Sequence, residues 1–168
     1  FMLLAIMSYQ YMSEGTIFFY LIIYLITTFG VFSVILNLRT SEGEITLLTG
    51  LNGLKASSRS KAISMLVFLF SLAGIPPFAG FFAKFFILSA SINEGFYILS
   101  VIAVISSVIA AFYYLSVIKN MFFNESDTEL LLDNNRFSSF IFISSAIIVT
   151  LFFFYPDPLI NLVDSLFK

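Results

Sequence analysis

Four stretches of this sequence run for at least 20 residues without a charged side chain: Gly15–Leu38, Ala62–Ala83, Gly95–Ile118 and Phe137–Pro156. About 20 apolar residues are enough for an α-helix to cross the hydrocarbon core of a bilayer. The composition agrees, because 60% of the residues are hydrophobic, only 11% are charged and the mean hydropathy is +1.02, values far outside those of soluble domains. The sequence therefore predicts a polytopic helical membrane protein.

The polar segments between these stretches divide the chain into helices and connections of a single membrane unit. We predict an all-α fold with four transmembrane helices over residues 16–38, 62–91, 96–118 and 137–155. The apolar start, residues 1–8, lacks the basic region and cleavage site of a signal peptide, so it is expected to be the end of a helix that begins elsewhere. The polar segment 39–61 is expected to lie along the membrane surface. Residues 156–168 are expected to form a short amphipathic tail, because prolines end the last helix.

Basic residues are distributed unequally over the connections. Positive charges in short loops mark the cytoplasmic or matrix side of a membrane protein. Only Lys168 falls on one predicted side, whereas the other side receives Arg39, Lys55, Arg59, Lys61, Lys119 and Arg136. The side with six basic residues is therefore predicted to face the cytoplasm or the matrix.

The charge-free stretch Ala62–Ala83 is interrupted by the sequence Gly74-Ile75-Pro76-Pro77. A proline inside a helix costs about 3 kcal/mol or more, because it has no N–H to donate. The carbonyls of Leu72 and Ala73 therefore lose their helical partners, and hydrocarbon offers no water in exchange. Such a break persists only where protein or a water-filled cavity supports it. We predict a helix that is discontinuous at Gly74–Pro77 and faces the interior of a bundle.

A single lysine, Lys84, follows Pro77 by seven residues within the predicted span 62–91. A cationic side chain at the centre of a bilayer costs about 2.5–3.5 kcal/mol on insertion scales. Burial disfavours the charged form of an amine, so a partly desolvated lysine can cycle between its charged and neutral forms. Two unfavourable features within about two helical turns indicate one functional site.

Each of these features also has a simpler interpretation. Membrane helices tolerate prolines as plain kinks. Lys84 could extend toward the membrane surface, although it lies roughly 12 Å from the helix end at Asn93, beyond comfortable reach. Hydroxyl side chains in the predicted spans are more typical of helix packing than of proton transfer; they include Thr27, Thr28, Ser33, Ser106, Ser107, Tyr113 and Tyr114. Lys84 is the only ionisable residue that we place inside the membrane, so further members of a relay are expected on another polypeptide.

Several functions are excluded or disfavoured by composition. The chain has no cysteine and no histidine, so thiolate chemistry, iron–sulfur ligation and the commonest haem and metal ligand are missing, and we expect no cofactor or metal site. The net charge is −2 and no basic run is present, which disfavours nucleic acid as a partner. The abundance of Phe, Ile, Leu, Ser and Asn is typical of AT-rich coding sequences, as in organelles or reduced bacterial genomes.

Three segments carry a resemblance to a known family. LAGIPPFAGFFAKFFIL (Leu72–Leu88), preceded by FYLIIYLITTFGVFSVILNLR (Phe19–Arg39) and followed by IAAFYYLSVIKNMFF (Ile109–Phe123), resembles the antiporter-like membrane subunits of proton-pumping NADH:quinone oxidoreductase, respiratory complex I. The lysine at position 84 followed by Phe85 is most similar to the subunit N type, called subunit 2 in mitochondria. The resemblance covers nearly the whole chain and corresponds to the last third of that subunit.

The resemblance implies a role for the broken helix. It assigns Lys84 to the proton relay, in the half-channel that leads to the outer compartment, and Gly74, Pro76 and Pro77 to its hinge. It implies a non-redox subunit of a proton-translocating NADH:ubiquinone reductase, without catalytic chemistry on this chain. Flavin, iron–sulfur clusters and quinone would be bound by partner subunits.

The resemblance also implies the surroundings of the chain. The partners would be other membrane subunits of complex I, a separate chain or segment with the missing N-terminal helices, and lipid. The location would be the mitochondrial inner membrane or, alternatively, a bacterial plasma membrane. The alternative function is that of a subunit of a multisubunit sodium/proton antiporter, which shares the broken helix.

Overall fold

The computed structural model describes residues 1–11, 14–40, 43–44, 48–125, 130–132 and 136–155, together with Asp157, Asn161 and Ser165. These residues form the helices α1 (Met2–Met7), α2 (Glu14–Ile35), α3 (Leu54–Ser57), α4 (Arg59–Ala73), α5 (Ala79–Asn93), α6 (Tyr97–Phe123) and α7 (Arg136–Phe154), two 3-10 turns, η1 (Tyr9–Tyr11) and η2 (Leu48–Leu51), and the short strands β1 (Leu38–Thr40), β2 (Gly43–Glu44) and β3 (Leu130–Leu132).

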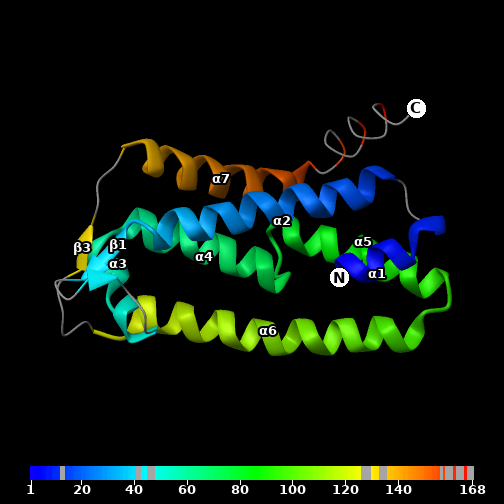
Figure 1. Cartoon of the computed structure of the whole chain (residues 1–168), viewed down its shortest axis with the longest axis horizontal. Helices are drawn as coiled ribbons and strands as arrows, with labels where there is room; N and C mark the ends of the chain where they lie inside the picture. The colour runs from blue at the N-terminus through cyan, green and yellow to red at the C-terminus, as the bar shows by residue number, and fades with distance from the viewer. Residues whose placement is uncertain are drawn as a thin grey trace.

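The long helices run along one axis, and α4 and α5 follow one another along it as two half-helices (Figure 1). The break between them lies near the middle of the long axis. The three strands, the start of α4, the end of α6 and the start of α7 lie together at one end, which is also where the six basic residues of the connections occur in the chain.

The predicted polytopic helical membrane fold, with a discontinuous helix over residues 62–91, is confirmed, and three short strands join it. Among the described helices, α2, α6 and the Phe137–Phe154 part of α7 are long and apolar enough to cross a membrane, and α5 is a shorter apolar helix. The structure places the helix ends within a few residues of the predicted ends, with the largest difference at α6, which continues to Phe123. Most of the predicted tail, residues 156–168, lies outside the described residues.

The connection after α2 differs from the expected surface segment. Strand β1 pairs in antiparallel register with β2 and with β3, so the sheet order is β2-β1-β3. The pairing Leu38↔Leu132 joins segments that are far apart in the sequence. The prediction for residues 39–61 considered only local polarity, and a strand whose partner lies in a distant loop leaves no local periodic signal over three residues.

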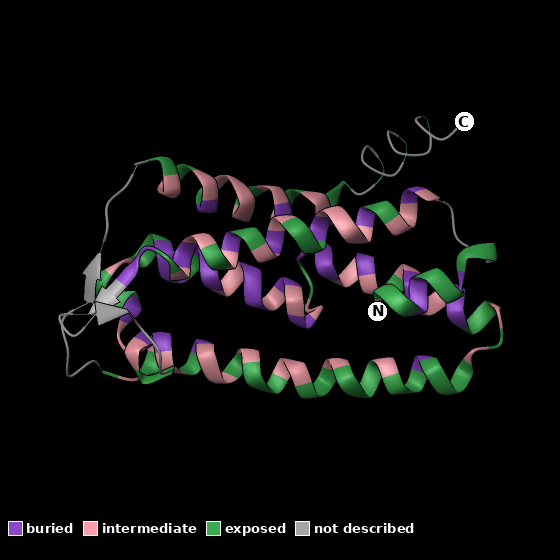
Figure 2. Ribbon diagram, viewed as in Figure 1, coloured by how far each residue is buried: buried purple, intermediate pink, exposed green. Residues whose placement is uncertain are grey.

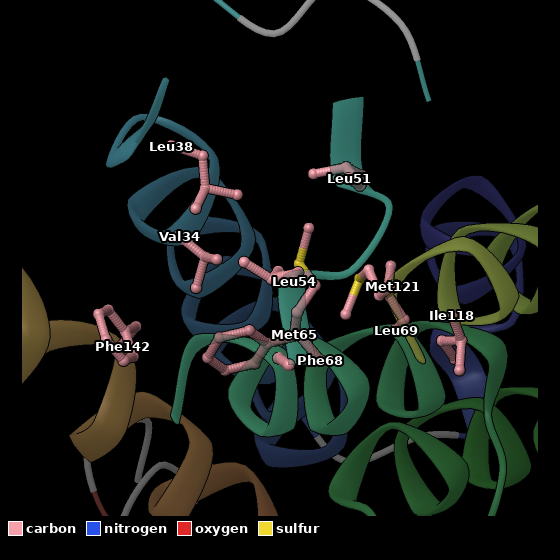
Figure 3. Packing of buried hydrophobic residues seen from close by; sticks show 11 residues of the cluster. Val34, Leu38, Leu51, Leu54, Met65, Phe68, Leu69, Ile118, Met121 and Phe142 are labelled. Carbon is pink, nitrogen blue, oxygen red and sulfur yellow. The ribbon is translucent and has the colours of Figure 1, made fainter. Parts of the chain in front are cut away.

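The main apolar core lies between α2, α4, α6 and α7, near the end that carries the sheet (Figure 3). Phe68 of α4 is fully buried there and faces Gly30 of α2, where an added Cβ would lie 2.6 Å from two atoms of the Phe68 ring. Glycine at position 30 therefore allows the close approach of the two helices. Most of α6, by contrast, is exposed along its length (Figure 2), as expected of an apolar helix whose surface lipid or further protein covers.

A second lysine, Lys61, is buried near the start of α4 and is only 2% exposed. Its Nζ donates a hydrogen bond of 3.2 Å to the carbonyl oxygen of Asn37, just beyond the end of α2. The sequence placed Lys61 in a polar connection and did not predict its burial. The reason is that α4 begins at Arg59, earlier than predicted, and includes Lys61 in its first turn.

Candidate functional site

Helix α4 ends in a closed turn at Gly74. The N–H of Gly74 donates to the carbonyl of Ser71 and the N–H of Ile75 donates to that of Phe70, both at 3.0 Å, which is the hydrogen-bond pattern of a Schellman motif. Gly74 has a φ of 81°, a left-handed conformation that favours glycine. The helix therefore stops at a defined residue, and the following segment carries Pro76 and Pro77, joined by a cis peptide bond.

Helix α5 starts directly beside the end of α4. The backbone N–H of Gly80, in the first turn of α5, donates a hydrogen bond of 3.2 Å to the Ser71 hydroxyl in the last turn of α4. A Cβ at position 80 would overlap the Ser71 carbonyl oxygen and lie 2.7 Å from its carbonyl carbon. The two half-helices are therefore in backbone contact, and Ser71 supplies a partner for one of the free N–H groups at the start of α5.

The amine of Lys84 lies at the end of α4, although the residue belongs to α5. Its Nζ donates to the carbonyl oxygens of Leu72, at 2.7 Å, and of Ala73, at 3.2 Å. These are the two carbonyls whose helical partners are replaced by Pro76 and Pro77. A third hydrogen bond, of 2.9 Å, goes to the Ser107 hydroxyl of α6. Lys84 thus fills the gap in the hydrogen bonding of the broken helix, and its amine does not extend toward Asn93.

The surroundings of the amine suit a positive charge. The C-terminal end of a helix carries a partial negative charge, which stabilises a nearby cation, and α4 ends at the two carbonyls that Lys84 contacts. The ring of Phe1 lies below the amine, with 5.1 Å between Nζ and the ring centroid, a distance at which an aromatic face attracts a cation. The aliphatic stem of Lys84 packs against Gly74, so the side chain is held along its whole length.

A cavity of about 200 Å³ opens beside Lys84. Most of its surface is apolar, but half of the residues that line it carry a hydroxyl group, namely Tyr20, Tyr24, Thr27, Ser71, Ser106, Ser107 and Tyr114. At about 30 Å³ for each molecule of liquid water, such a space has room for roughly six waters, and waters need polar partners of this kind. The cavity can therefore hold the water that proton exchange with the amine requires.

The structure brings together all the residues singled out at the break. Gly74, Pro76 and Pro77 form the segment between the half-helices, and Lys84 returns to that segment from α5. The hydroxyls expected to pack helices separate into two groups. Ser33 bonds to Ser138 of α7 at 3.2 Å, which is a packing contact, whereas Ser107 contacts the lysine.

Three residues of the site were not identified from the sequence as parts of it. Ser71 and Gly80 form the contact between the half-helices, and Ser107 contacts the amine from α6. The pair Ala79-Gly80 after the prolines was the available signal for a close approach, since small residues mark contacts between membrane helices. Ser107 was one hydroxyl among many, and no local pattern distinguishes it from its neighbour Ser106.

Chemically, the arrangement is suited to holding and releasing a proton. A lysine ammonium group releases one proton when it becomes neutral. Here the amine lies between fixed hydrogen-bond acceptors and a cavity with room for water. Among the described residues that line this cavity, the ionisable side chains are Lys84 and three tyrosines. The site offers a proton-binding group inside an otherwise apolar bundle.

Comparison with known proteins gives a consistent result. Residues 1–110 match the family described as NADH:quinone oxidoreductase/Mrp antiporter, transmembrane. NADH-quinone oxidoreductase subunit N of Rhodospirillum rubrum is 42% identical over 142 residues, which cover 84% of this chain and 29% of the relative. Subunit N of Pelagibacter ubique is 37% identical over 147 residues, covering 88% of this chain and 31% of the relative. The chain therefore spans about a third of the length of these relatives.

A solved structure has the same fold. A chain of respiratory complex I from Thermus thermophilus, solved with bound aureothin, superimposes with a TM-score of 0.79 at 23% sequence identity. The match covers 89% of this chain and 34% of that chain.

Proposed function

Because the chain belongs to the NADH:quinone oxidoreductase/Mrp antiporter transmembrane family, we propose that it is the part of a subunit N that contains the broken helix, and that Lys84 carries a proton. In this proposal Lys84 accepts a proton from within the membrane and releases it toward the outer compartment. Gly74, Pro76 and Pro77 act as the hinge around which the half-helices adjust. The chain supplies no redox chemistry of its own to the quinone reductase.

The observation that carries the proposal is the position of the amine. Lys84 lies at the break, bonded to Leu72 and Ala73, with a hydroxyl-lined cavity beside it. A lysine kept only for structure would be an expensive choice in a membrane, since a central cation costs about 2.5–3.5 kcal/mol on insertion scales. A lysine that binds and releases protons needs both a stabilised charge and access to water, and both are present.

The wider assembly follows from the same proposal. The missing two-thirds of the subunit, on this or a separate polypeptide, would supply the proton to Lys84, and other complex I subunits would bind flavin, iron–sulfur clusters and quinone. The relatives named above are bacterial, which supports a bacterial plasma membrane over the mitochondrial inner membrane that the resemblance first implied. Copurification of flavin and iron–sulfur proteins separates this proposal from a sodium/proton antiporter, which has no such partners.

The test compares the half-buried Lys84 with the buried Lys61 of the same broken helix. Lys84→Met, made in the full subunit within the assembled complex, should lower NADH-driven proton translocation into inside-out vesicles by about tenfold or more, since a positioned proton-transfer group contributes roughly 10²–10⁴-fold to a rate. Lys61→Met is the control, because its amine bonds to Asn37 at the sheet end, away from the cavity. It should leave translocation unchanged.

Native gels report assembly for both variants. Normal translocation by assembled Lys84→Met would refute the role of Lys84. Equal losses in both variants would also refute it, because the effect would then follow from removing any buried lysine.

A further inference from the structure

Ser107 lies half-buried in the middle of α6, next to Ser106. Both serines line the cavity at the break, but their hydroxyls have different partners. Ser106 Oγ donates 2.8 Å to the carbonyl of Ile102 on its own helix. Ser107 Oγ lies 2.9 Å from Lys84 Nζ and 3.4 Å from the carbonyl oxygen of Ala73. Ser107 thus connects α6 to the break between the half-helices.

The charged form of Lys84 has all its hydrogen bonds in this geometry. An ammonium group has three N–H donors and no acceptor. Its three partners are the Leu72 carbonyl at 2.7 Å, the Ser107 hydroxyl at 2.9 Å and the Ala73 carbonyl at 3.2 Å. Each can accept, so the charge is fully bonded by protein. In this state the Ser107 hydrogen is directed to the Ala73 carbonyl.

The neutral amine of Lys84 needs a different set of hydrogen bonds from the same three partners. It has two N–H donors and one lone pair, and the lone pair needs a donor. A carbonyl oxygen cannot donate, whereas a hydroxyl can donate or accept by rotating about its C–O bond. Of the three hydrogen-bond partners that the structure gives the amine, Ser107 alone has a hydrogen to offer. A buried polar atom left without a partner is unfavourable.

We infer that Ser107 is a positioning residue whose hydroxyl reverses its hydrogen bond each time Lys84 gains or loses a proton. The inference rests on the proposed role of Lys84. On release, an Nζ–H bond breaks and the proton passes to water in the cavity, while the Ser107 hydrogen turns from the Ala73 carbonyl to the amine lone pair. No bond within Ser107 breaks. The Ser107 hydroxyl therefore stays hydrogen-bonded to the amine in both states of the lysine.

The experiment is a series at position 107 in the full subunit of the assembled complex. Ser107→Ala removes the reversible group while Leu72 and Ala73 still hold the amine, and it should lower proton translocation by roughly fivefold, the effect of one ordinary hydrogen bond. Ser107→Thr keeps the hydroxyl and should retain the rate. Cysteine is closest to serine in size but is a weak hydrogen-bond donor. The translocation rate of Ser107→Cys should therefore lie between those of Ser107→Ala and Ser107→Thr. Ser106→Ala is the matched control and should be unchanged.

The order of the series decides the inference. If Ser107 acts by hydrogen bonding, the rate of proton translocation should be highest with Ser or Thr at position 107, lower with Cys and lowest with Ala. If Ser107 acts only by packing, the rate with Cys should equal the rate with Ser. A normal rate in Ser107→Ala, a Cys variant equal to wild type, or a Thr variant as slow as Ala would each overturn the inference. Combining Ser107→Ala with Lys84→Met should add no loss, because Ser107 acts through the lysine. Normal translocation in Lys84→Met alone would instead refute the underlying function.

Discussion

Gly80→Ala tests the contact between the two half-helices. The added methyl group would overlap the carbonyl oxygen of Ser71 and lie 2.7 Å from its carbonyl carbon, where ordinary contacts begin at 3.4 Å. The obstacle is backbone, so no rotation of a side chain relieves it. The carbonyl carbon alone requires the half-helices to separate by about 0.7 Å, and the closer carbonyl oxygen requires more, before ordinary van der Waals contact is restored.

The separation has an energetic and a geometric effect. Overpacking costs about 1–3 kcal/mol and the loss of the hydrogen bond between Gly80 N–H and Ser71 Oγ about 1 kcal/mol, while alanine gains about 1 kcal/mol in helix propensity. The net loss of stability should be about 1–3 kcal/mol. The same displacement would stretch the hydrogen bond from Lys84 to Leu72 from 2.7 Å to more than about 3.4 Å, beyond the usual range.

The assay follows thermal denaturation of the full subunit in detergent and proton translocation in vesicles. The midpoint should fall by about 2 °C, taking 2 kcal/mol and roughly 1 °C for each kcal/mol in a subunit about three times the length of this chain, and translocation should fall with it. Ser71→Ala is the control that removes the hydrogen bond without adding an atom, and it should cost about 1 kcal/mol. If Gly80→Ala has the wild-type midpoint and rate, the half-helices are not in backbone contact and the reasoning is wrong.

Three further outcomes are expected. Gly30→Ala should lower the thermal midpoint because its Cβ would overlap the Phe68 ring. Adding Phe68→Leu to the same chain should restore part of the midpoint, since here the obstacle is a side chain. A double variant with no recovery would contradict this explanation. Asn37→Ala should lose about 1–2 kcal/mol, because the Asn37 amide donates to the Ser33 backbone; an unchanged midpoint would count against that network. The hydrogen bond from the Tyr9 hydroxyl to Glu14 raises the pKa of Tyr9, so this contact is complete below the ordinary tyrosine value near 10 and is lost as pH rises through the raised value. An ultraviolet titration of wild type minus Tyr9→Phe should show that late transition, and Glu14→Gln should move it back.

Hydropathy predicted most of the fold because the bilayer imposes one strong rule. Every spanning segment must be apolar and must form its own backbone hydrogen bonds, so charge-free stretches correspond to helices. The break at Gly74 to Pro77 was predictable because proline has no N–H to donate. The sheet was missed because β1 and β3 pair over a long distance with only three residues each. The burial of Lys61 was missed because its long side chain reaches a carbonyl on another helix.

The site was only partly predictable. The sequence identified the carbonyls of Leu72 and Ala73 as lacking donors, and it identified Lys84 as an isolated charge. It did not show that the Lys84 amine supplies the donors that these two carbonyls lack. The direction of the lysine side chain depends on how closely α5 lies against α4. That approach requires Gly80 to have no side chain, a condition that appears only when both half-helices are placed.

The half-helices α4 and α5 have 15 residues each, so each is about 22 Å long, short of the roughly 30 Å of hydrocarbon that a spanning helix must cross. Neither can be integrated into the bilayer by itself. During biosynthesis the insertion machinery therefore has to accept both as one hydrophobic unit, with its prolines and its lysine. The bonds from Lys84 to the ends of α4 form only inside that unit, so this span enters the membrane before it acquires its final shape.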